Sequence, residues 1–254
     1  MEGGAAPLRI SVVVPSWRDA ETLAVLVPAL AQLRRLAQII IVDASATAAT
    51  EQLAIAHGAI LLKCSAPNRG AQMNVGAMFA SGDVVLFQHA DTELTDAHLA
   101  AIQEALRDPQ VIGGAFYRKF DDRHRYLMWL EQVARFLTRR GGTLYGDQSV
   151  FVRRELFLQL GGFAKFPLME DVEFSRRLRA AGKIAVLDPP VRTSARRHAR
   201  RGAWKTSIQN GLFIVLYKCG VSPMTLHRWY YGALVVQPAS APAESDKHEQ
   251  ALSS

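Results

Sequence analysis

The sequence predicts an α/β fold with a parallel sheet in a single domain, and three observations predict it. Short apolar runs rich in Val and Ile alternate with longer segments whose apolar residues recur at helical spacing. Two of these runs lead into an Asp at the strand end, where open α/β sheets bind their ligands. A chain of 254 residues with 49% hydrophobic and 21% charged residues can also bury a core without disulfides or metals.

The first half of the chain is predicted to alternate strands with helices. The expected strands are apolar and too short for helices, and they lie at residues 10–15, 38–43, 60–62, 84–88 and 113–120. The expected helices separate them, at residues 23–33, 48–57, 70–80 and 96–107. Strands that are apolar throughout are typical of a parallel sheet buried on both faces. The alternation therefore indicates βαβ units with a ligand site beyond the carboxyl ends of the strands.

The second half has a less regular pattern. Helices are expected at residues 126–137, 154–160, 171–181 and 204–217, and strands at 149–152, 184–187 and 191–193. From residue 237 onward the sequence is rich in Pro, Ala, Ser and charge, which is typical of a disordered tail. The chain is therefore divided into an extension at 1–7, one domain at 8–225 with halves at 8–115 and 116–225, and a tail at 237–254.

The positive charge of the chain is concentrated in one segment. The net charge is +7, and residues 189–243 contain no acidic residue. A polyanion, a phosphorylated ligand or an anionic membrane surface is the natural partner of such a block. A solvated helix face is the alternative, although such faces usually mix both signs. The basic residues of the segment are Arg192, Arg196, Arg197, Arg200, Arg201, Lys205, Lys218 and Arg228.

The cysteines and the N-terminal residues indicate a cytoplasmic setting. Cys64 and Cys219 lie far apart with no CxxC motif, so a disulfide framework and a zinc site are both poorly supported. The first residues lack the pattern of a signal peptide, and no uncharged apolar run approaches the ~18 residues needed to span a bilayer. We therefore expect a cytoplasmic protein, with a peripheral contact at the inner face of the membrane as a second expectation for the basic segment.

The turn after the first strand lacks the familiar phosphate-binding motifs. Pro15 is followed by Ser16-Trp17-Arg18-Asp19 without a glycine, so the Rossmann fingerprint, the P-loop and the G-x-S-x-G elbow are all missing. What the sheet offers instead is a pair of carboxylates, Asp43 closing the second strand and Asp91 following the fourth. Either Asp could be a helix cap or turn residue, but two at equivalent strand ends favour a ligand site.

The ordered set of segments resembles a known family. VVVPSWRDAETL (12–23), IIIVDAS (39–45), NRGAQMNVGA (68–77), SGDVVLFQHADT (81–92), FVRRELFLQLGGF (151–163) and MEDVEFSRRLRAAG (169–182) occur in that order. Together they resemble family 2 glycosyltransferases of the GT-A fold, over roughly residues 8–220. The Gly-Asp-Gln at 146–148 and the His-Ala-Asp at 89–91 are similar to a bacterial branch labelled as radical SAM/selenodomain-associated or as arsenosugar biosynthesis glycosyltransferases.

The resemblance implies that residues 8–115 bind a nucleotide-sugar donor, a UDP- or GDP-sugar. Pro15, Ser16 and Asp19 match the family's first loop, which holds the nucleoside. Asp43 matches the carboxylate that accepts from the base, as a uracil N–H requires. Arg69 matches the basic residue that closes on the nucleotide.

The resemblance also implies a divalent metal, Mg²⁺ or Mn²⁺. Asp91 stands where the family's DxD motif binds the metal, and His89 replaces the first Asp, which removes one negative charge. In some GT-A enzymes a late His completes the metal shell, and His198 matches that place. Arg197 and its basic neighbours are expected to clamp the diphosphate of the leaving group.

The acceptor half, 116–225, carries the candidate catalytic base. Glu170-Asp171 matches the family's ED pair at a helix start, with Asp171 as the base and Glu170 as its support. A simple helix cap is the alternative for Asp171, but it leaves two adjoining carboxylates unexplained. Asp147 and Gln148 precede a strand and are expected to line the acceptor pocket.

The sequence is thus interpreted as a metal-assisted glycosyltransferase (a hexosyltransferase-type enzyme) that transfers a sugar to an unknown acceptor hydroxyl with inversion. A nucleotidyltransferase, or another α/β protein that binds nucleotide sugars, is the first alternative. A nucleotidyltransferase would require a Gly-rich basic loop after the first strand, which SWRDAE does not supply. A nucleic-acid-binding module is the second alternative. Its basic block would be interleaved with stacking aromatics, and this one is not, so no nucleic acid is expected.

Overall fold

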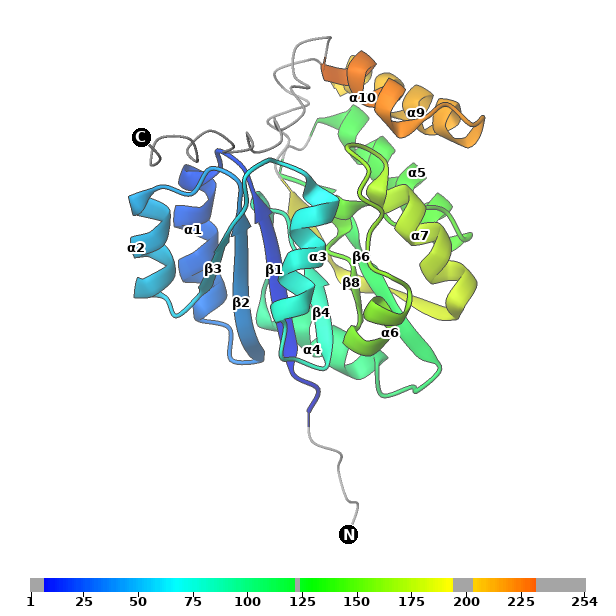
Figure 1. The fold of residues 1–254 in the computed structure, drawn as a ribbon. Helices are drawn as coiled ribbons and strands as arrows, with labels where there is room; N and C mark the ends of the chain where they lie inside the picture. The colour runs from blue at the N-terminus through cyan, green and yellow to red at the C-terminus, as the bar shows by residue number, and fades with distance from the viewer. Residues whose placement is uncertain (1–6, 122–123, 194–202, 232–254) are drawn as a thin grey trace, which may run out of the picture.

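A mixed β-sheet forms the centre of the protein in the computed structural model, which describes residues 7–121, 124–193 and 203–231. Within these residues the sheet has eight strands in the order β3-β2-β1-β4-β7-β6-β8-β5. Helices cover both of its faces (Figure 1). The predicted α/β fold is therefore confirmed. In the first half of the chain, β1 pairs in parallel with β2 and β4, and β2 pairs in parallel with β3.

The first half forms the βαβ units that the sequence predicts. Its elements are β1 (Ile10–Ser16), α1 (Ala20–Ala31), β2 (Leu36–Asp43), α2 (Ala48–Ala56), β3 (Ile60–Lys63), α3 (Arg69–Phe79), β4 (Val84–Phe87) and α4 (Asp96–Ala105). The central strand β1 pairs in parallel with β2 and β4, so that Val13 lies beside both Ile40 and Phe87. Alternate β1 side chains face opposite layers, because strand residues alternate across a sheet. Val12 and Val14 pack under α1 and α4, and Val13 packs under α3.

The second half continues the sheet with an antiparallel strand at its centre. The elements not yet named are β5 (Thr92–Glu93), β6 (Val111–Phe120), α5 (Arg125–Arg139), the 3₁₀ helix η1 (Gly146–Gln148), β7 (Phe151–Arg153), α6 (Arg154–Gln159), α7 (Glu170–Ala181), β8 (Lys183–Thr193), α9 (Ala203–Lys218) and α10 (Pro223–Tyr231). Strand β7 is antiparallel to both β4 and β6. The carboxyl ends of β4 and β6 therefore meet the carboxyl ends of β1 and β2 at one edge of the sheet. We call this edge the carboxyl edge.

Four elements differ from the sequence prediction. The two short strands expected at 184–187 and 191–193 are one strand, β8, because its pairing with β6 resumes beyond a register shift that absorbs Pro189 and Pro190. Proline removes only one backbone donor, so a strand can continue past it at such an irregularity. Strand β5, η1 and α10 were not expected from the sequence. Helix α10 crosses residue 225, the predicted end of the domain, and the division into halves stays a prediction.

Helix α3 is held against the carboxyl edge by close packing and by a cap. The Asn68 side chain accepts a hydrogen bond from the Ala71 amide at 2.9 Å, which fixes the first turn of the helix. Farther along α3, a Cβ on Gly76 would lie 2.3 Å from Cγ1 of Val13, so only glycine allows this approach to β1. The first residue of α3, Arg69, therefore reaches the carboxyl edge at a fixed place. Across the described ranges, none of the helices is long and apolar enough to cross a membrane.

Candidate active site

The carboxyl ends of β1 and β2 form the first part of the candidate site. Asp43 is the last residue of β2, lies beside Ser16 of β1, and is 2% exposed. Its Oδ1 accepts hydrogen bonds from the Ser45 amide at 2.9 Å and the Ser45 hydroxyl at 3.0 Å. Nε2 of Gln72 donates to the carbonyls of Ser16 and Val42, both at 2.8 Å, and so ties the two strand ends to α3. Asp43 is thus a buried carboxylate in a preorganised position.

The loop after β1 follows directly on this part of the site. Arg18 has a φ of 58°, in the left-handed region, and Oδ2 of Asp19 accepts from the Trp17 amide at 3.3 Å. The Ser16 hydroxyl is buried and has no hydrogen-bond partner in the described residues. Trp17 is 46% exposed and is the residue that the sequence interpretation missed here. An aromatic residue directly after a strand, in a loop that binds a planar ligand, is the signal that could have identified it.

Arg69 connects the two halves of the domain. Its guanidinium forms an ion pair with Glu170 at the start of α7, and its Nη2 lies 3.5 Å from Oδ2 of Asp171. Its Nη1 lies 3.1 Å from Nε2 of His89, which follows β4. Burial of the guanidinium opposes its charge, but the carboxylates of Glu170 and Asp171 outweigh this effect and raise the pKa of Arg69. Because a guanidinium can only donate, Nε2 of His89 is the acceptor in this contact.

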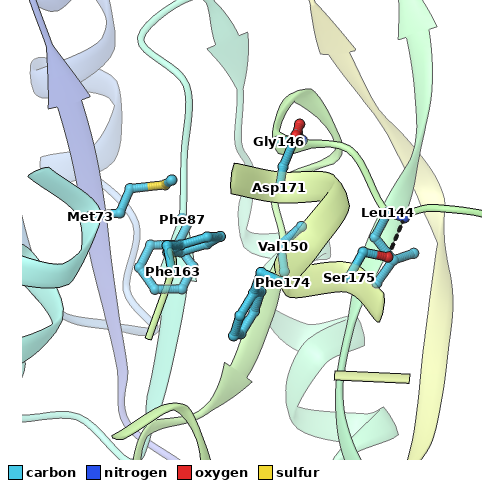
Figure 2. Close-up of a pocket in the computed structure, with 9 residues that line it drawn as sticks. All are labelled: Met73, Phe87, Leu144, Gly146, Val150, Phe163, Asp171, Phe174 and Ser175. Atoms are coloured by element: carbon cyan, nitrogen blue, oxygen red, sulfur yellow. Dashed lines mark hydrogen bonds between the residues drawn. The ribbon is translucent and has the colours of Figure 1, made fainter. Parts of the chain in front are cut away.

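Asp171 lies at the rim of a small apolar cavity between α3, β4 and α7. The cavity has a volume of about 10 Å³, and its walls are largely the side chains of Met73, Phe87, Phe163 and Phe174 (Figure 2). Oδ1 of Asp171 accepts from the Val172 amide at 2.8 Å, and Oδ2 accepts from the Gly146 amide at 2.9 Å.

The apolar surroundings change the acidity of this carboxyl group. Burial raises the pKa of Asp171, and the neighbouring charge of Glu170 raises it further. Arg69 and the two backbone amides act in the opposite direction but do not cancel the increase. A carboxylate with a raised pKa and held in a fixed geometry has the properties of a general base.

Asp147 lies close to Asp171 but in a different electrostatic environment. Its carboxylate forms an ion pair with Arg118 of β6. Burial works to raise the pKa of Asp147, but the positive charge of Arg118 and the hydrogen bond that Arg118 donates, together with the charge of Arg69, outweigh burial and lower it. Gln148 is buried, donates to the Phe116 carbonyl at 3.2 Å and accepts from the Tyr145 amide at 2.8 Å, so both ends of its amide hold η1 in place.

A larger cavity opens beside Asp147 at the carboxyl end of β6. It has a volume of about 260 Å³ and lies between β6, α5 and Pro190. Its lining combines aromatic rings with charged and amide groups, and includes Tyr117, Arg118, Phe120, Glu131, Arg135 and Gln148. Arg118 joins it to the site, because the same guanidinium pairs with Asp147. This cavity was not predicted from the sequence, because α5 and β6 form it only in three dimensions.

Of the two metal ligands expected from the sequence, Asp91 lies within the residues that the structure describes. It is exposed and lies in the loop between β4 and β5. The residues described contain no cluster of three or more His, Cys, Asp or Glu side chains that would hold a metal alone. One carboxylate still fits Mg²⁺ or Mn²⁺, because these ions take most of their ligands from substrate phosphates and water. His198 and Arg197, the other candidates on this side, lie outside the described residues.

Backbone strain marks three segments around the site. Among the described residues, the non-glycine positions with positive φ are Arg18 at 58°, Ser149 at 50° and Met169 at 69°. Arg18 lies beside Asp19, Ser149 follows Gln148, and Met169 precedes Glu170. Such conformations cost of order 1–3 kcal/mol each and tend to cluster at functional sites. The strain therefore supports the same three segments that the sequence singled out.

The family of the chain follows from a sequence profile. The profile of "Glycosyl transferase family 2" matches residues 11–159, which is more than half of the chain. The match spans the carboxyl ends of β1, β2 and β4 and continues through η1. The protein belongs to glycosyl transferase family 2. No curated protein matches the chain significantly in sequence.

Solved structures share the fold at low sequence identity. TarS 1–349 from S. aureus is 15% identical with a TM-score of 0.60, over 74% of this chain and 61% of that chain. The mannosyltransferase PcManGT from Pyrobaculum calidifontis is 18% identical with a TM-score of 0.62, over 90% of this chain and 73% of that chain. Glucosyl-3-phosphoglycerate synthase from Mycobacterium tuberculosis is 20% identical with a TM-score of 0.53, over 74% of this chain and 70% of that chain.

These similarities confirm the predicted GT-A fold. The chain spans about 61% of the length of the TarS fragment. At these identities the similarity concerns the fold, so donor and acceptor must be argued from the residues of this chain.

Proposed function

We propose that this protein transfers a sugar from a nucleoside-diphosphate donor to an acceptor hydroxyl group. The observation that carries the proposal is the position of Arg69 between Glu170 and Asp171 of α7 and His89 after β4. The guanidinium of Arg69 thus lies between the carboxyl edge, formed by the ends of β1, β2 and β4, and the carboxylates of the second half. That is where the negative charge of a diphosphate leaving group develops during sugar transfer.

The donor base would bind at the ends of β1 and β2. The buried carboxylate of Asp43 can accept an N–H of uracil or guanine, and the loop at Pro15, Ser16 and Asp19 would surround the nucleoside. The exposed ring of Trp17 offers a flat surface for the base. TarS 1–349 has been crystallised with UDP-GlcNAc and PcManGT with GDP-Man and Mn²⁺, which supports a UDP- or GDP-sugar as the donor.

The leaving group would be stabilised by Arg69 and by a divalent cation bound to Asp91. Arg69 would donate to the diphosphate from the carboxyl edge, with Glu170 fixing the direction of its guanidinium. A divalent cation held by Asp91 and the diphosphate would neutralise the charge of the leaving nucleoside diphosphate. Arg197 and His198 remain candidates for the same task. The complex of glucosyl-3-phosphoglycerate synthase with Mn²⁺ and UDP supports a divalent cation.

Asp171 would act as the general base in a direct displacement. An ionised carboxylate has about four acceptor sites, and three are used by the Val172 amide, the Gly146 amide and Arg69. The remaining site would receive the proton of the acceptor hydroxyl. The acceptor oxygen then bonds to the anomeric carbon as the bond from that carbon to the diphosphate oxygen breaks. Attack from the face opposite the leaving group inverts the anomeric carbon.

The acceptor would lie in the cavity of about 260 Å³ between β6 and α5. Aromatic rings beside charged and amide groups are typical of sites for polar, hydroxyl-bearing molecules. We also propose a hexosyl donor and a place in the arsenosugar or radical SAM-associated branch, on the basis of Gly146 to Gln148 and the His-Ala-Asp segment.

A thermal-shift panel tests the donor assignment. Purified full-length protein is heated with UDP, GDP, CDP and their sugars, with and without Mn²⁺. We expect one nucleotide class to raise the melting temperature in a manner that depends on Mn²⁺. The proposal fails if no nucleoside diphosphate raises the melting temperature under either condition.

A further inference from the structure

Helix α9 is apolar on two opposite faces. On one face Phe213 is buried and packs with Met169 and Val172 at the start of α7 and with Leu226 of α10. The opposite face carries Ile208, Leu212 and Val215, which are 61%, 53% and 56% exposed. We call these three residues the α9 stripe. Their spacing of four and three residues places them above one another along the helix.

The outer face of α9 is unusual for a helix in water. A surface helix normally turns its polar side to the solvent and keeps one apolar stripe for the core. Here the core side is already supplied by Phe213, so the α9 stripe is a second apolar face. Figure 1 shows α9 and α10 together at the outer end of the molecule, beyond α5 and α7. The α9 stripe therefore indicates a surface that is covered by another protein molecule or by a membrane.

Helix α10, which packs on Phe213 of α9, exposes two large side chains of its own. Met224 is 49% exposed and Trp229 is 59% exposed. A tryptophan combines an apolar ring with a polar N–H, and it is enriched where a hydrocarbon region meets water. An exposed tryptophan and an exposed apolar stripe on two neighbouring helices are typical of helices that lie in a lipid headgroup region.

The positive charge of α9 and α10 favours a membrane over a second copy of the chain as the partner of this surface. Residues 189–243 contain no Asp or Glu, and the exposed Lys218 and Arg228 lie on α9 and α10 themselves. A second copy of the chain would bring the same positive charges into contact, and like charges across an interface are costly. An anionic lipid surface offers the opposite charge together with an apolar layer beneath it.

We propose that α9 and α10 form a docking surface for an anionic membrane. The α9 stripe enters the boundary between headgroups and acyl chains, and Lys218 and Arg228 contact the lipid phosphates. The proposal goes beyond the transfer reaction, since lipid binding requires neither donor nor acceptor. Because Phe213 packs on Met169 and Val172, docking would place α9 between the lipid surface and the start of α7.

Sedimentation with vesicles tests the docking surface. Full-length protein is mixed with vesicles of phosphatidylglycerol and phosphatidylcholine, or of phosphatidylcholine alone, at low and high salt. We expect binding to the anionic vesicles that weakens as salt rises. Leu212→Glu and Val215→Glu should each lower the partition coefficient at least about tenfold, because each replaces buried apolar area by a charge. Arg228→Ala should lower it about fivefold.

Val25→Glu is the matched control. Val25 is 75% exposed on α1, away from α9 and α10, so the same type of change there should leave vesicle binding unaltered. Circular dichroism and the melting temperature verify that each variant is folded, and the two stripe variants are judged separately. The proposal is overturned if the wild type ignores anionic vesicles at low salt, or if both stripe variants bind as the wild type does. It is also overturned if light scattering shows a dimer that Leu212→Glu dissociates without any vesicle binding.

Discussion

Replacing Asp171 by Asn removes the proposed base and keeps the shape of its side chain. In the wild type, Oδ1 and Oδ2 of Asp171 accept from the amides of Val172 and Gly146 at 2.8 and 2.9 Å. An Asn side chain retains one of these acceptors and cannot take a proton from a hydroxyl. A positioned carboxylate base contributes roughly 10²- to 10⁴-fold. We therefore expect kcat to fall at least about 10²-fold, equivalent to about 2.7 kcal/mol of activation free energy.

The assay follows nucleoside diphosphate release from the donor that the thermal-shift panel selects. Donor affinity is measured separately by calorimetry, and it should be nearly unchanged in Asp171→Asn, because Asp43 and Asp91 bind the donor in the proposed site. Glu170→Gln should cost less than Asp171→Asn, since Glu170 pairs with Arg69 and is not the proposed base. An Asp171→Asn protein with near-normal kcat would refute the assignment of the base.

The pH profile gives an independent test of the same assignment. The base must be ionised, so activity is lost as pH falls through its pKa. Burial and the charge of Glu170 raise the pKa of Asp171, so the acid limb of kcat should lie above ~3.9, the ordinary value for Asp. The Arg118 guanidinium, by its charge and its hydrogen bond, lowers the pKa of Asp147 despite the burial of this carboxyl group. An acid limb below the ordinary value would therefore favour Asp147 as the base.

Three further predictions concern the rest of the site. Asp91→Ala should abolish the Mn²⁺-promoted part of nucleotide binding, whereas Asp43→Ala should weaken binding and retain its Mn²⁺ dependence, as measured by calorimetry with UDP and GDP. Gly146→Ala should reduce kcat, because the new Cβ would lie 2.9 Å from Nε2 of His89 and would displace this side chain in the site. The control Gly211→Ala, with open space around its Cβ in α9, should instead raise the free energy of unfolding by about 0.8 kcal/mol. Arg69→Met leaves the buried carboxylate of Glu170 without its cation, so urea unfolding should show that the free energy of unfolding falls by about 2 kcal/mol. The decrease is smaller than for a fully buried pair because Arg69 is partly exposed.

The sequence predicts the first half of the fold well because its patterns are local. The apolar runs at β1, β2 and β4 and the cap at Asn68 report burial and helix starts directly. The position of β7 is different, because nothing in its three residues indicates that they pair antiparallel between β4 and β6. Strand β8 was divided in the prediction because two prolines usually end a strand, and only its pairing with β6 shows that it continues.

The candidate site was predictable in its residues and not in its contacts. Arg69, Glu170 and Asp171 are recognisable as motif positions, but the ion pair between α3 and α7 depends on how the two halves close. The apolar cavity at Asp171 and the burial that raises the pKa of that residue depend on Phe163 and Phe174, whose place beside Asp171 only the structure shows. In α9 the structure assigns the core contact to Phe213 and leaves the α9 stripe exposed.

Product analysis with a panel of nucleotide sugars tests the central claim most directly. Full-length protein is incubated with UDP- and GDP-sugars and Mn²⁺, and the nucleotide products are separated by chromatography. With water in the place of the unknown acceptor hydroxyl, we predict slow release of the nucleoside diphosphate and the free sugar from at least one donor, at a rate that Asp171→Asn lowers and Asp91→Ala abolishes. Release of a nucleoside monophosphate, or no turnover of any donor by protein that binds none of the nucleotides, would contradict the account.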